Sequence, residues 1–265
     1  MGRYGPSGAV KTADQESEPE AMKIAGAVAL VTGASSGIGA ATARELARRG
    51  ARVILAARRV DLLNEQVAAI TAAGGQASVI EADISDLASL PAFASQAEAI
   101  YGQIDILVNN AGIHIRGKPG QIAPADIALM VNTNLTGAIT LTRLLLPAML
   151  QRRRGAITCV ASVAGNIAND SLYSGTKFGL RGYALALRRQ LHSSGVTVSV
   201  VSPGYIDTPL TSYRGSRMPG PALIANAIAG LIERPRREVV APWWYRIPIA
   251  LERIAPWLVD LGLRR

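Results

Sequence analysis

Tyr173 and Lys177 stand four residues apart, just upstream of a long apolar-periodic segment whose pattern predicts a helix. Four residues are about one helical turn, so the phenol and the ammonium group would share one face of that helix. A neighbouring cation favours the phenolate and lowers the pKa of a tyrosine from its ordinary value of about 10. The pair therefore predicts a proton donor and acceptor, although the spacing alone also fits a solvated surface pair.

A glycine-rich loop follows the first apolar run of the chain. The run at 27–32 leads directly into Gly33-Ala-Ser-Ser-Gly37-Ile-Gly39, and a helical pattern then extends to Arg49. Glycines in such a turn let a pyrophosphate approach the backbone, and the amides at the start of a helix attract its negative charge. The loop lacks the Gly-Lys-Ser/Thr ending of a P-loop. It predicts dinucleotide binding, with a plain strand-to-helix turn as the alternative.

Two arginines mark the end of the second predicted strand, 51–57. Arg58 and Arg59 lie about 20 residues beyond the glycine loop, where a cofactor with a free ribose 2′-hydroxyl would favour an acid. Guanidinium groups bind a 2′-phosphate instead. The sequence therefore predicts NADP rather than NAD; the alternative is that both arginines begin a solvated helix.

The elements that must position these residues alternate along the chain. Strand patterns at 27–32, 51–57, 77–82, 104–108, 156–161 and 196–201 are separated by helical patterns, one of which, 125–153, is broken near Thr136 and Gly137. This order predicts an α/β fold: a doubly wound parallel sheet, Rossmann-like, with helices on both faces, in a single domain. Several strands end in small or polar residues, at the edge where such sheets bind ligands.

The ordered motifs resemble the short-chain dehydrogenase/reductase superfamily over about residues 23 to 242. They are Thr32-Gly33-x3-Gly37-x-Gly39, Asn109-Asn-Ala-Gly112, Asn134, Ser162, Tyr173-x3-Lys177 and Pro203-Gly204. The resemblance implies that Tyr173 is the general acid/base and that Lys177 holds the nicotinamide ribose and lowers the tyrosine pKa. It also implies that Ser162 binds the substrate oxygen and that Asn134 holds a water in a proton relay.

The same resemblance implies an NADP-binding set. The set is Gly33, Ser35, Ser36, Gly37, Ile38, Gly39, Arg58, Asp83, Asn110, Ala111, Gly112, Tyr173, Lys177, Pro203, Gly204, Ile206 and Thr208. Asp83 would reach the adenine and Thr208 the nicotinamide carboxamide, while Asn109 would support the sheet. The interval from Ser162 to Tyr173 is 11 residues, shorter than is usual in that family, which predicts an altered pocket wall at 163–172.

The filled motif set predicts an NADP(H)-dependent oxidoreductase that interconverts a ketone or aldehyde and an alcohol. The motifs do not identify the substrate, and a steroid-like or lipid-like compound is one option. A 3-oxoacyl carrier-protein reductase is the alternative among enzymes, and an NADP-binding sensor or scaffold without turnover is the alternative from another class. The stretches 114–118 and 205–221 would form further pocket walls. His114 itself is expected to be a loop histidine in solvent.

Composition excludes several other classes. The net charge is +9 and the pI is near 10.2, but the arginines are dispersed and no nucleic-acid motif accompanies them, so we expect no nucleic-acid partner. One cysteine, Cys159, and two separated histidines predict neither a disulfide framework nor a metal site. No apolar run reaches the roughly 18 residues that a membrane-spanning helix requires. We expect a cytoplasmic protein, with peripheral membrane contact as an option.

The two ends differ from the predicted oxidoreductase domain at 23–242. Residues 1–22 carry no apolar period and predict a disordered extension. Residues 243–265 contain all three tryptophans and apolar residues at helical spacing, with Pro248 fitting a helix start and Pro256 a restart. This amphipathic extension fits an interfacial helix on an anionic membrane, and equally a homodimer or homotetramer interface or a cover over the pocket.

Overall fold

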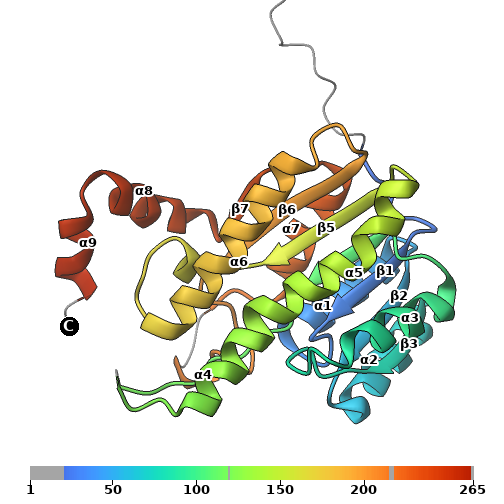
Figure 1. Ribbon diagram of the computed structural model, residues 1–265, viewed down its shortest axis with the longest axis horizontal. Helices are drawn as coiled ribbons and strands as arrows, with labels where there is room; N and C mark the ends of the chain where they lie inside the picture. Colours follow the sequence, from blue (N-terminus) through green and yellow to red (C-terminus); the bar gives the residue numbers. More distant parts are fainter. Residues whose placement is uncertain (1–20, 119, 215–217, 264–265) are drawn as a thin grey trace, which may run out of the picture.

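A seven-stranded parallel sheet forms the centre of the protein, with strand order β3-β2-β1-β4-β5-β6-β7 (Figure 1). The structure is a computed structural model that describes residues 21–118, 120–214 and 218–263, so the predicted N-terminal extension lies almost wholly outside the described residues. The strands are β1 (Val28–Thr32), β2 (Arg52–Ala57), β3 (Gln76–Glu81), β4 (Ile106–Asn109), β5 (Gly155–Val160), β6 (Val196–Pro203) and β7 (Glu238–Ala241).

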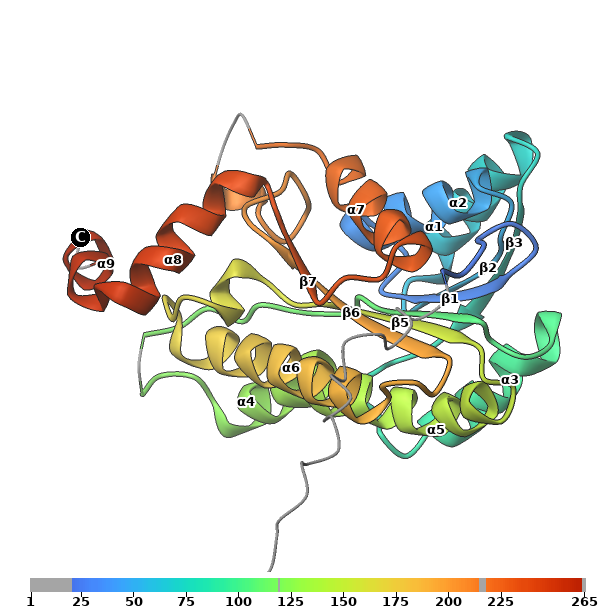
Figure 2. The ribbon, with the colours of Figure 1, turned by 90° about the horizontal axis from the view of Figure 1, so that it is seen from above.

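Helices cover both faces of this sheet (Figure 2). One face carries α1 (Gly37–Arg48), α2 (Val60–Ala72) and α7 (Ala222–Glu233); the other carries α3 (Leu90–Tyr101), α5 (Gly137–Gln151) and α6 (Ser171–Gln190). The short helix α4 (Pro124–Val131) leads into α5 through a π-helical turn, Asn132–Thr136. The predicted doubly wound fold is confirmed, and the predicted strands lie within two residues of the observed ones.

The apolar run of β1 explains why the sheet needs helices on both faces. Ala29 and Val31 pack into the core beneath α1 and α7, whereas Leu30 packs into the core beneath α3 and α5. All five residues of β1 are buried, as expected for a central parallel strand. Full burial of a side chain such as Leu30 contributes about 1.5–3 kcal/mol, so the alternating contacts hold both helix layers.

The elements at 222–241 have no counterpart among the predicted strands and helices. Helix α7 is apolar on nearly every side, which leaves no clear 3.6-residue period to read. Strand β7 is only four residues long and begins with a charge, Glu238. That carboxylate accepts hydrogen bonds from Arg181 at 2.7 Å and from Ser202 at 2.7 Å, so long-range contacts rather than local pattern place the strand.

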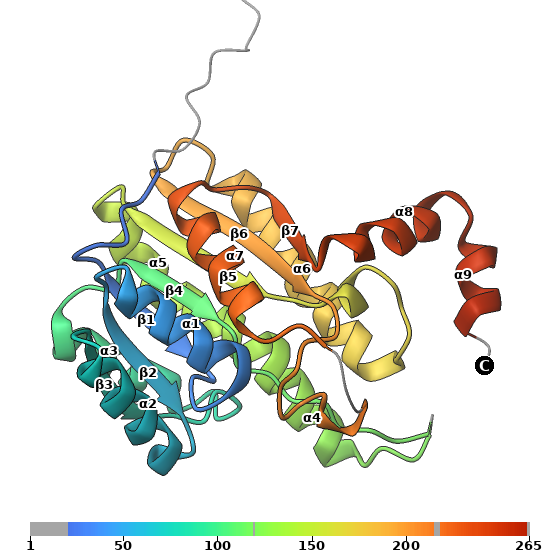
Figure 3. The ribbon, with the colours of Figure 1, turned by 180° about the vertical axis from the view of Figure 1, so that it is seen from behind.

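Two further helices, α8 (Arg246–Ile254) and α9 (Pro256–Leu263), project from the body as an arm, residues 243–263 (Figure 3). The predicted restart at Pro256 is right, but α8 begins at Arg246 rather than Pro248. The arm is attached where the Tyr245 ring packs against the Cα of Gly204, in space that a Cβ at that position would fill. None of the described helices is long and apolar enough to cross a membrane.

Candidate active site

A cleft of about 1140 Å³ opens at the carboxyl ends of the strands, where parallel sheets of this order bind ligands. Most residues of the predicted site line it: Gly33, Ser35, Ser36, Gly37, Ile38, Arg58, Asp83, Asn110, Ala111, Gly112, Ser162, Tyr173, Lys177, Pro203, Gly204, Ile206 and Thr208. Two predicted members, Gly39 and Asn134, are absent from the lining. The first lies within α1, and the second is buried behind the cleft wall.

Thr32 joins the two strand ends at the centre of the cleft. Its hydroxyl accepts the backbone N–H groups of Asn110 and Ala111, each at 3.0 Å, and its carbonyl accepts the Asn110 side-chain amide at 2.8 Å. These bonds fix the end of β4 beside the glycine loop that follows β1. Inside the sheet, the Asn109 amide donates to Thr142 at 2.8 Å, consistent with the structural role expected for it.

The glycine loop offers the backbone surface predicted from the sequence. Helix α1 begins at Gly37, and the Ser36 side chain makes no cap hydrogen bond to it, so the amides of the first turn are left for another acceptor. At Gly39 a Cβ would overlap the Gly33 carbonyl and the Asn110 amide. Only glycine fits this point, where the loop, the helix and the end of β4 meet.

The two arginines after β2 divide between different partners. Arg59 donates to Ser35 Oγ at 3.0 Å and to Ser36 Oγ at 2.8 Å, so its guanidinium lies directly on the glycine loop. Arg58 faces Asp83 instead, with 3.6 Å between Nη1 and Oδ2. Arg59 is therefore a site residue that the sequence-based set omitted, since adjacent arginines look alike in sequence and only their directions distinguish them.

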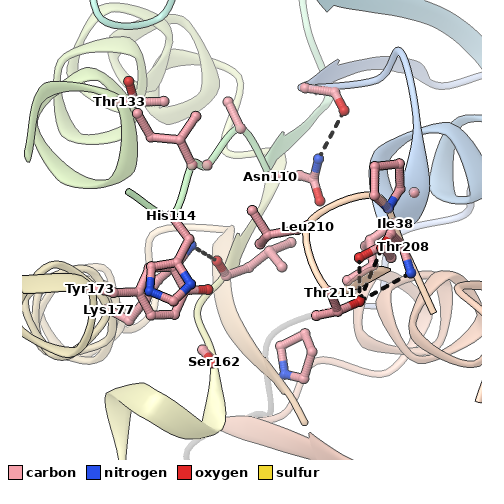
Figure 4. Close-up of a pocket in the computed structure, with 18 of the residues that line it drawn as sticks. Ile38, Asn110, His114, Thr133, Ser162, Tyr173, Lys177, Thr208, Leu210 and Thr211 are labelled. Carbon is pink, nitrogen blue, oxygen red and sulfur yellow. Dashed lines mark hydrogen bonds between the residues drawn. The ribbon is translucent and has the colours of Figure 1, made fainter. Parts of the chain in front are cut away.

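Helix α6 places Tyr173 and Lys177 on the cleft as predicted (Figure 4). The helix starts at Ser171 because the Asp170 side chain caps it, accepting the Tyr173 N–H at 2.9 Å. Lys177 Nζ lies 5.8 Å from the centre of the Tyr173 ring and donates to the Val160 carbonyl at 3.0 Å. One helical turn thus brings both groups to the end of β5.

Burial, rather than the neighbouring cation, sets the protonation of this pair. Loss of solvent raises the pKa of Tyr173 to about 12, with a hydrogen bond from Ser162 opposing the rise. Loss of solvent also lowers the pKa of Lys177 to about 8. The pKa of Tyr173 thus lies above its ordinary value here, and the expected lowering by Lys177 with the oxidised cofactor stays a prediction. A protonated phenol at neutral pH is suited to donating a proton.

Ser162 lies at the end of β5, where the chain turns into a short 3₁₀ helix, Val163–Gly165. Its hydroxyl accepts the Ala164 N–H at 3.1 Å and lies near enough to the Tyr173 phenol to oppose the rise of the phenol pKa. The short interval between Ser162 and Tyr173 therefore still brings the two hydroxyls together. A ligand oxygen placed between the two hydroxyls could accept a hydrogen bond from each of them.

Asn134 occupies the π-helical turn between α4 and α5. Its carbonyl oxygen accepts the Ile113 N–H at 2.8 Å, while its amide donates to the Ile113 carbonyl at 2.9 Å and to Thr176 at 3.1 Å. The side chain thus holds the loop after β4 against α6. Turns of this kind are frequent at functional sites because they redirect one side chain within a helix.

His114 differs from the expectation of a solvent-exposed loop histidine. Its side chain is only 16% exposed, and its Nε2 lies 3.1 Å from Asp170 Oδ2. Further residues that line the cleft but were not predicted as site residues are Arg116, Tyr205, Leu210, Thr211 and Tyr213, and Arg116 stacks on the Tyr213 ring. The sequence marked these stretches as pocket walls but gave no signal of which side chains meet.

Comparison with known proteins finds the family that the sequence motifs resemble. The family model described as "short chain dehydrogenase" matches residues 27–218. Ketoacyl reductase HetN of Nostoc sp. is 37% identical over 252 residues, which are 89% of this chain and 88% of the relative. The 3-oxoacyl-acyl-carrier-protein reductase FabG of Escherichia coli is 35% identical over 225 residues, 79% and 91% of the two chains.

Solved structures give the same result. A variant of actinorhodin polyketide ketoreductase with NADPH is 30% identical, has a TM-score of 0.76, and the match covers 82% of this chain and 95% of that one. A metagenomic short-chain oxidoreductase in complex with NADP is 36% identical, with a TM-score of 0.73 and coverage of 83% and 97%. The chain belongs to the short-chain dehydrogenase/reductase family. The predicted family, fold and oxidoreductase class are confirmed.

Proposed function

We propose that this protein reduces the keto group of a 3-oxoacyl thioester with NADPH, Tyr173 donating the proton. The observation that carries the proposal is the arrangement of Ser162, Tyr173 and Lys177 at the end of β5, on a cleft that the glycine loop also lines. The prediction of NADP is supported by both solved relatives, one of which is a structure with NADPH and the other a complex with NADP.

The residues of the cleft fit such a cofactor. The glycine loop leaves no room for a Cβ at Gly39 and presents the first amides of α1, which suit a pyrophosphate. Arg59, with the hydroxyls of Ser35 and Ser36, forms a donor cluster that suits a phosphate on the adenosine ribose. Lys177 and Thr208 line the same cleft, Thr208 beside Gly37, and we assign the nicotinamide half of the cofactor to them.

NADPH supplies the hydride to the carbonyl carbon when bound. The Ser162 hydroxyl donates a hydrogen bond to the carbonyl oxygen and so favours the negative charge that develops there. Tyr173, protonated because burial raises its pKa to about 12, gives its proton to the same oxygen. The Lys177 ammonium beside it stabilises the phenolate that remains until a proton returns through the groups around Asn134.

The choice of an oxoacyl thioester draws on the relatives named as ketoacyl reductases, together with the cations Arg116 and Lys118 on the cleft. A lipophilic ketone without a thioester is the second candidate, favoured by the exposed tryptophans of the arm. Loss of NADPH absorbance with an acetoacetyl thioester and with a matched hydrophobic ketone separates the two. We expect kcat/KM to be at least about tenfold higher for the thioester, a transition-state difference of about 1.4 kcal/mol.

The Tyr173→Phe variant tests whether Tyr173 donates the proton, and activity of the parent distinguishes an enzyme from a cofactor-binding scaffold without turnover. The change removes only the oxygen that carries the proton, so we expect NADPH affinity and melting temperature within error of the parent and turnover reduced by at least about 10²-fold. Near-parent activity of this variant with a good substrate would refute the role of Tyr173. Absence of activity in the parent across the whole panel would favour the scaffold.

We further propose that the arm makes a peripheral contact with an anionic membrane and that the protein is a homodimer or homotetramer. Trp243, Ile247, Ile254, Trp257 and Leu261 are each at least 64% exposed. Exposed Arg246 and Arg253 adjoin Ile247 and Ile254 on α8, which gives the mixture of apolar, aromatic and cationic groups found at bilayer surfaces. Gly262 of the arm also lines the cleft, so such contact would bring its mouth near the lipid.

Co-sedimentation of the full chain with vesicles, with and without phosphatidylserine, tests the membrane contact. Binding should need the anionic lipid, fall at high salt, and be lost in Ile254→Glu with Trp257→Glu. Leu223→Glu, which changes an exposed apolar residue of α7, is the control and should still bind. If the parent stays in the supernatant at low salt and the arm variants lower its mass in solution, the arm is an oligomer interface instead.

A further inference from the structure

The carboxylate of Asp170 has two different partners at the entrance to the proposed catalytic helix. Its Oδ1 accepts the backbone N–H of Tyr173 at 2.9 Å and so caps α6, while its Oδ2 lies 3.1 Å from His114 Nε2. A carboxylate can only accept hydrogen bonds, so Nε2 must carry a proton and donate it. The couple therefore ties the loop after β4 to the first turn of α6.

The imidazole of His114 also covers one side of the Tyr173 ring. The two ring centres are 4.6 Å apart and their planes are inclined by 31°. With only 16% of the His114 side chain exposed, this contact is held inside the cleft rather than at its rim. Tyr173 is thus fixed twice by the same pair, through its backbone N–H and through its aromatic face. Figure 4 shows the His114 and Tyr173 rings next to each other.

The charge of Asp170 also acts on the phenol. It is among the groups that raise the pKa of Tyr173, after burial. A donor on the carboxylate draws part of that charge away from the phenol, so the imidazole opposes the effect of its own partner. Without the imidazole, the unpaired carboxylate would disfavour the phenolate more strongly.

We infer that His114 is a positioning residue: acting through Asp170, it orients the Tyr173 phenol for proton transfer and shields it from the carboxylate. The inference deepens the proposed function and rests on Tyr173 being the acid. The interval of 11 residues between Ser162 and Tyr173 places Asp170 as the cap three residues before the tyrosine, within reach of His114. No spacing rule shows this, because the two members of the couple are 56 residues apart.

Other ionisable groups surround the couple and must be held constant in any test. They are Tyr173 and Lys177 of α6, Tyr205 and Tyr213 of the segment after β6, Arg116 and Lys118 of the loop that carries His114, and Asp260 of α9. The experiment therefore changes only the two members of the couple. The cofactor complex is used throughout, so that the cleft is in its working state.

The readout is the titration of Tyr173 itself, followed by the ¹³Cζ resonance of labelled tyrosine in the NADP complex. The resonance is assigned by its loss in Tyr173→Phe. In His114→Phe, which keeps an aromatic ring but cannot donate to Asp170, the midpoint should rise by about one pH unit. In Asp170→Asn, which keeps an acceptor for the cap but removes the charge, the midpoint should fall.

Two further variants complete the set. His114→Gln, which can still donate to Asp170, should restore most of the parent midpoint, and His192→Phe, which changes the exposed second histidine, should leave it unmoved. Rates of alcohol oxidation should follow the midpoints: His114→Phe should lower kcat about tenfold near neutral pH with little change in KM, because less phenolate is present.

An unchanged Tyr173 midpoint in His114→Phe would overturn the inference. If the melting temperature also falls, the contact between His114 and Asp170 only stabilises the fold. Neither result depends on turnover. If the parent reduces no ketone but the midpoints shift as expected, the inference stands for the phenol and the proposed function fails; if turnover is present and the midpoints do not move, only the inference fails.

Discussion

Replacing Arg59 by alanine is expected to abolish most of the preference for NADPH over NADH. In the structure the guanidinium lies 3.0 Å from Ser35 Oγ and 2.8 Å from Ser36 Oγ, so its donors gather beside the glycine loop. A charge-assisted hydrogen bond to a phosphate is worth about 1.5–3 kcal/mol. Its loss should weaken NADPH binding by about 10- to 150-fold. NADH, which lacks the 2′-phosphate, should bind the variant as it binds the parent.

Arg58→Ala is the matched control because it removes the same group from the next residue. Arg58 is 62% exposed and its partner Asp83 40% exposed, and such pairs contribute little. We expect a loss of NADPH affinity of less than about fivefold, corresponding to at most about 1 kcal/mol. Comparison of the two variants therefore shows whether Arg59, on the glycine loop, or Arg58, which faces Asp83, binds the phosphate.

Cofactor fluorescence titrations of the parent and both variants with NADPH and NADH measure these affinities. Ionic strength must be equal in all of them, since a guanidinium–phosphate contact at the surface is screened by salt. An unchanged ratio of NADPH to NADH affinity in Arg59→Ala would refute the reasoning. A larger loss in Arg58→Ala would show that Arg58, the residue chosen from the sequence, holds the phosphate.

Two other predictions concern stability. A hydrogen bond from Arg48 lowers the pKa of Glu45 from 4.5 to about 2, so this carboxylate stabilises the fold above pH 4.5 and the contribution is lost as the pH falls towards 2. Glu45→Gln should thus lower the urea midpoint at pH 7 and match the parent near pH 2; an equal deficit at both pH values would contradict this. A Cβ at Gly39 would overlap the Gly33 carbonyl, so Gly39→Ala should cost about 1–3 kcal/mol in urea unfolding, whereas Gly230→Ala, with open space around it, should not destabilise.

The fold could be predicted from the sequence because the patterns that indicate strands and helices are local. Each parallel strand is a short apolar run between glycine-rich turns, and the helices between strands carry a regular apolar period. It missed α7 and β7 because a helix that is apolar all round and a four-residue edge strand carry no such period. Their positions depend on contacts such as Arg181 with Glu238, which are distant in sequence.

The sequence predicts those site residues that directly follow a strand or begin a helix at the carboxyl edge of the sheet. Ser162, Tyr173 and Lys177 come together because β5 and α6 must deliver them to one edge of the sheet. The pairing of His114 with Asp170 and the direction of Arg59 depend on side-chain orientation, which residue spacing does not encode. The effect of burial on the pKa of Tyr173 was not readable from the sequence for a related reason, since the cost of burial depends on everything packed around the phenol.

The π-helical turn at Asn132–Thr136 fixes the rotational phase of the helices on either side of it. In an α-helix each residue advances the chain by about 100°, and a π turn accommodates one residue more than an α turn. Deleting one residue from this turn would give a regular helix but rotate α5 relative to α4 by that angle. Leu141, Leu145 and Met149, now buried against the sheet, would then leave the core. The turn therefore makes two contacts compatible: α5 packs its apolar face on the sheet, and the Asn134 side chain binds the loop after β4.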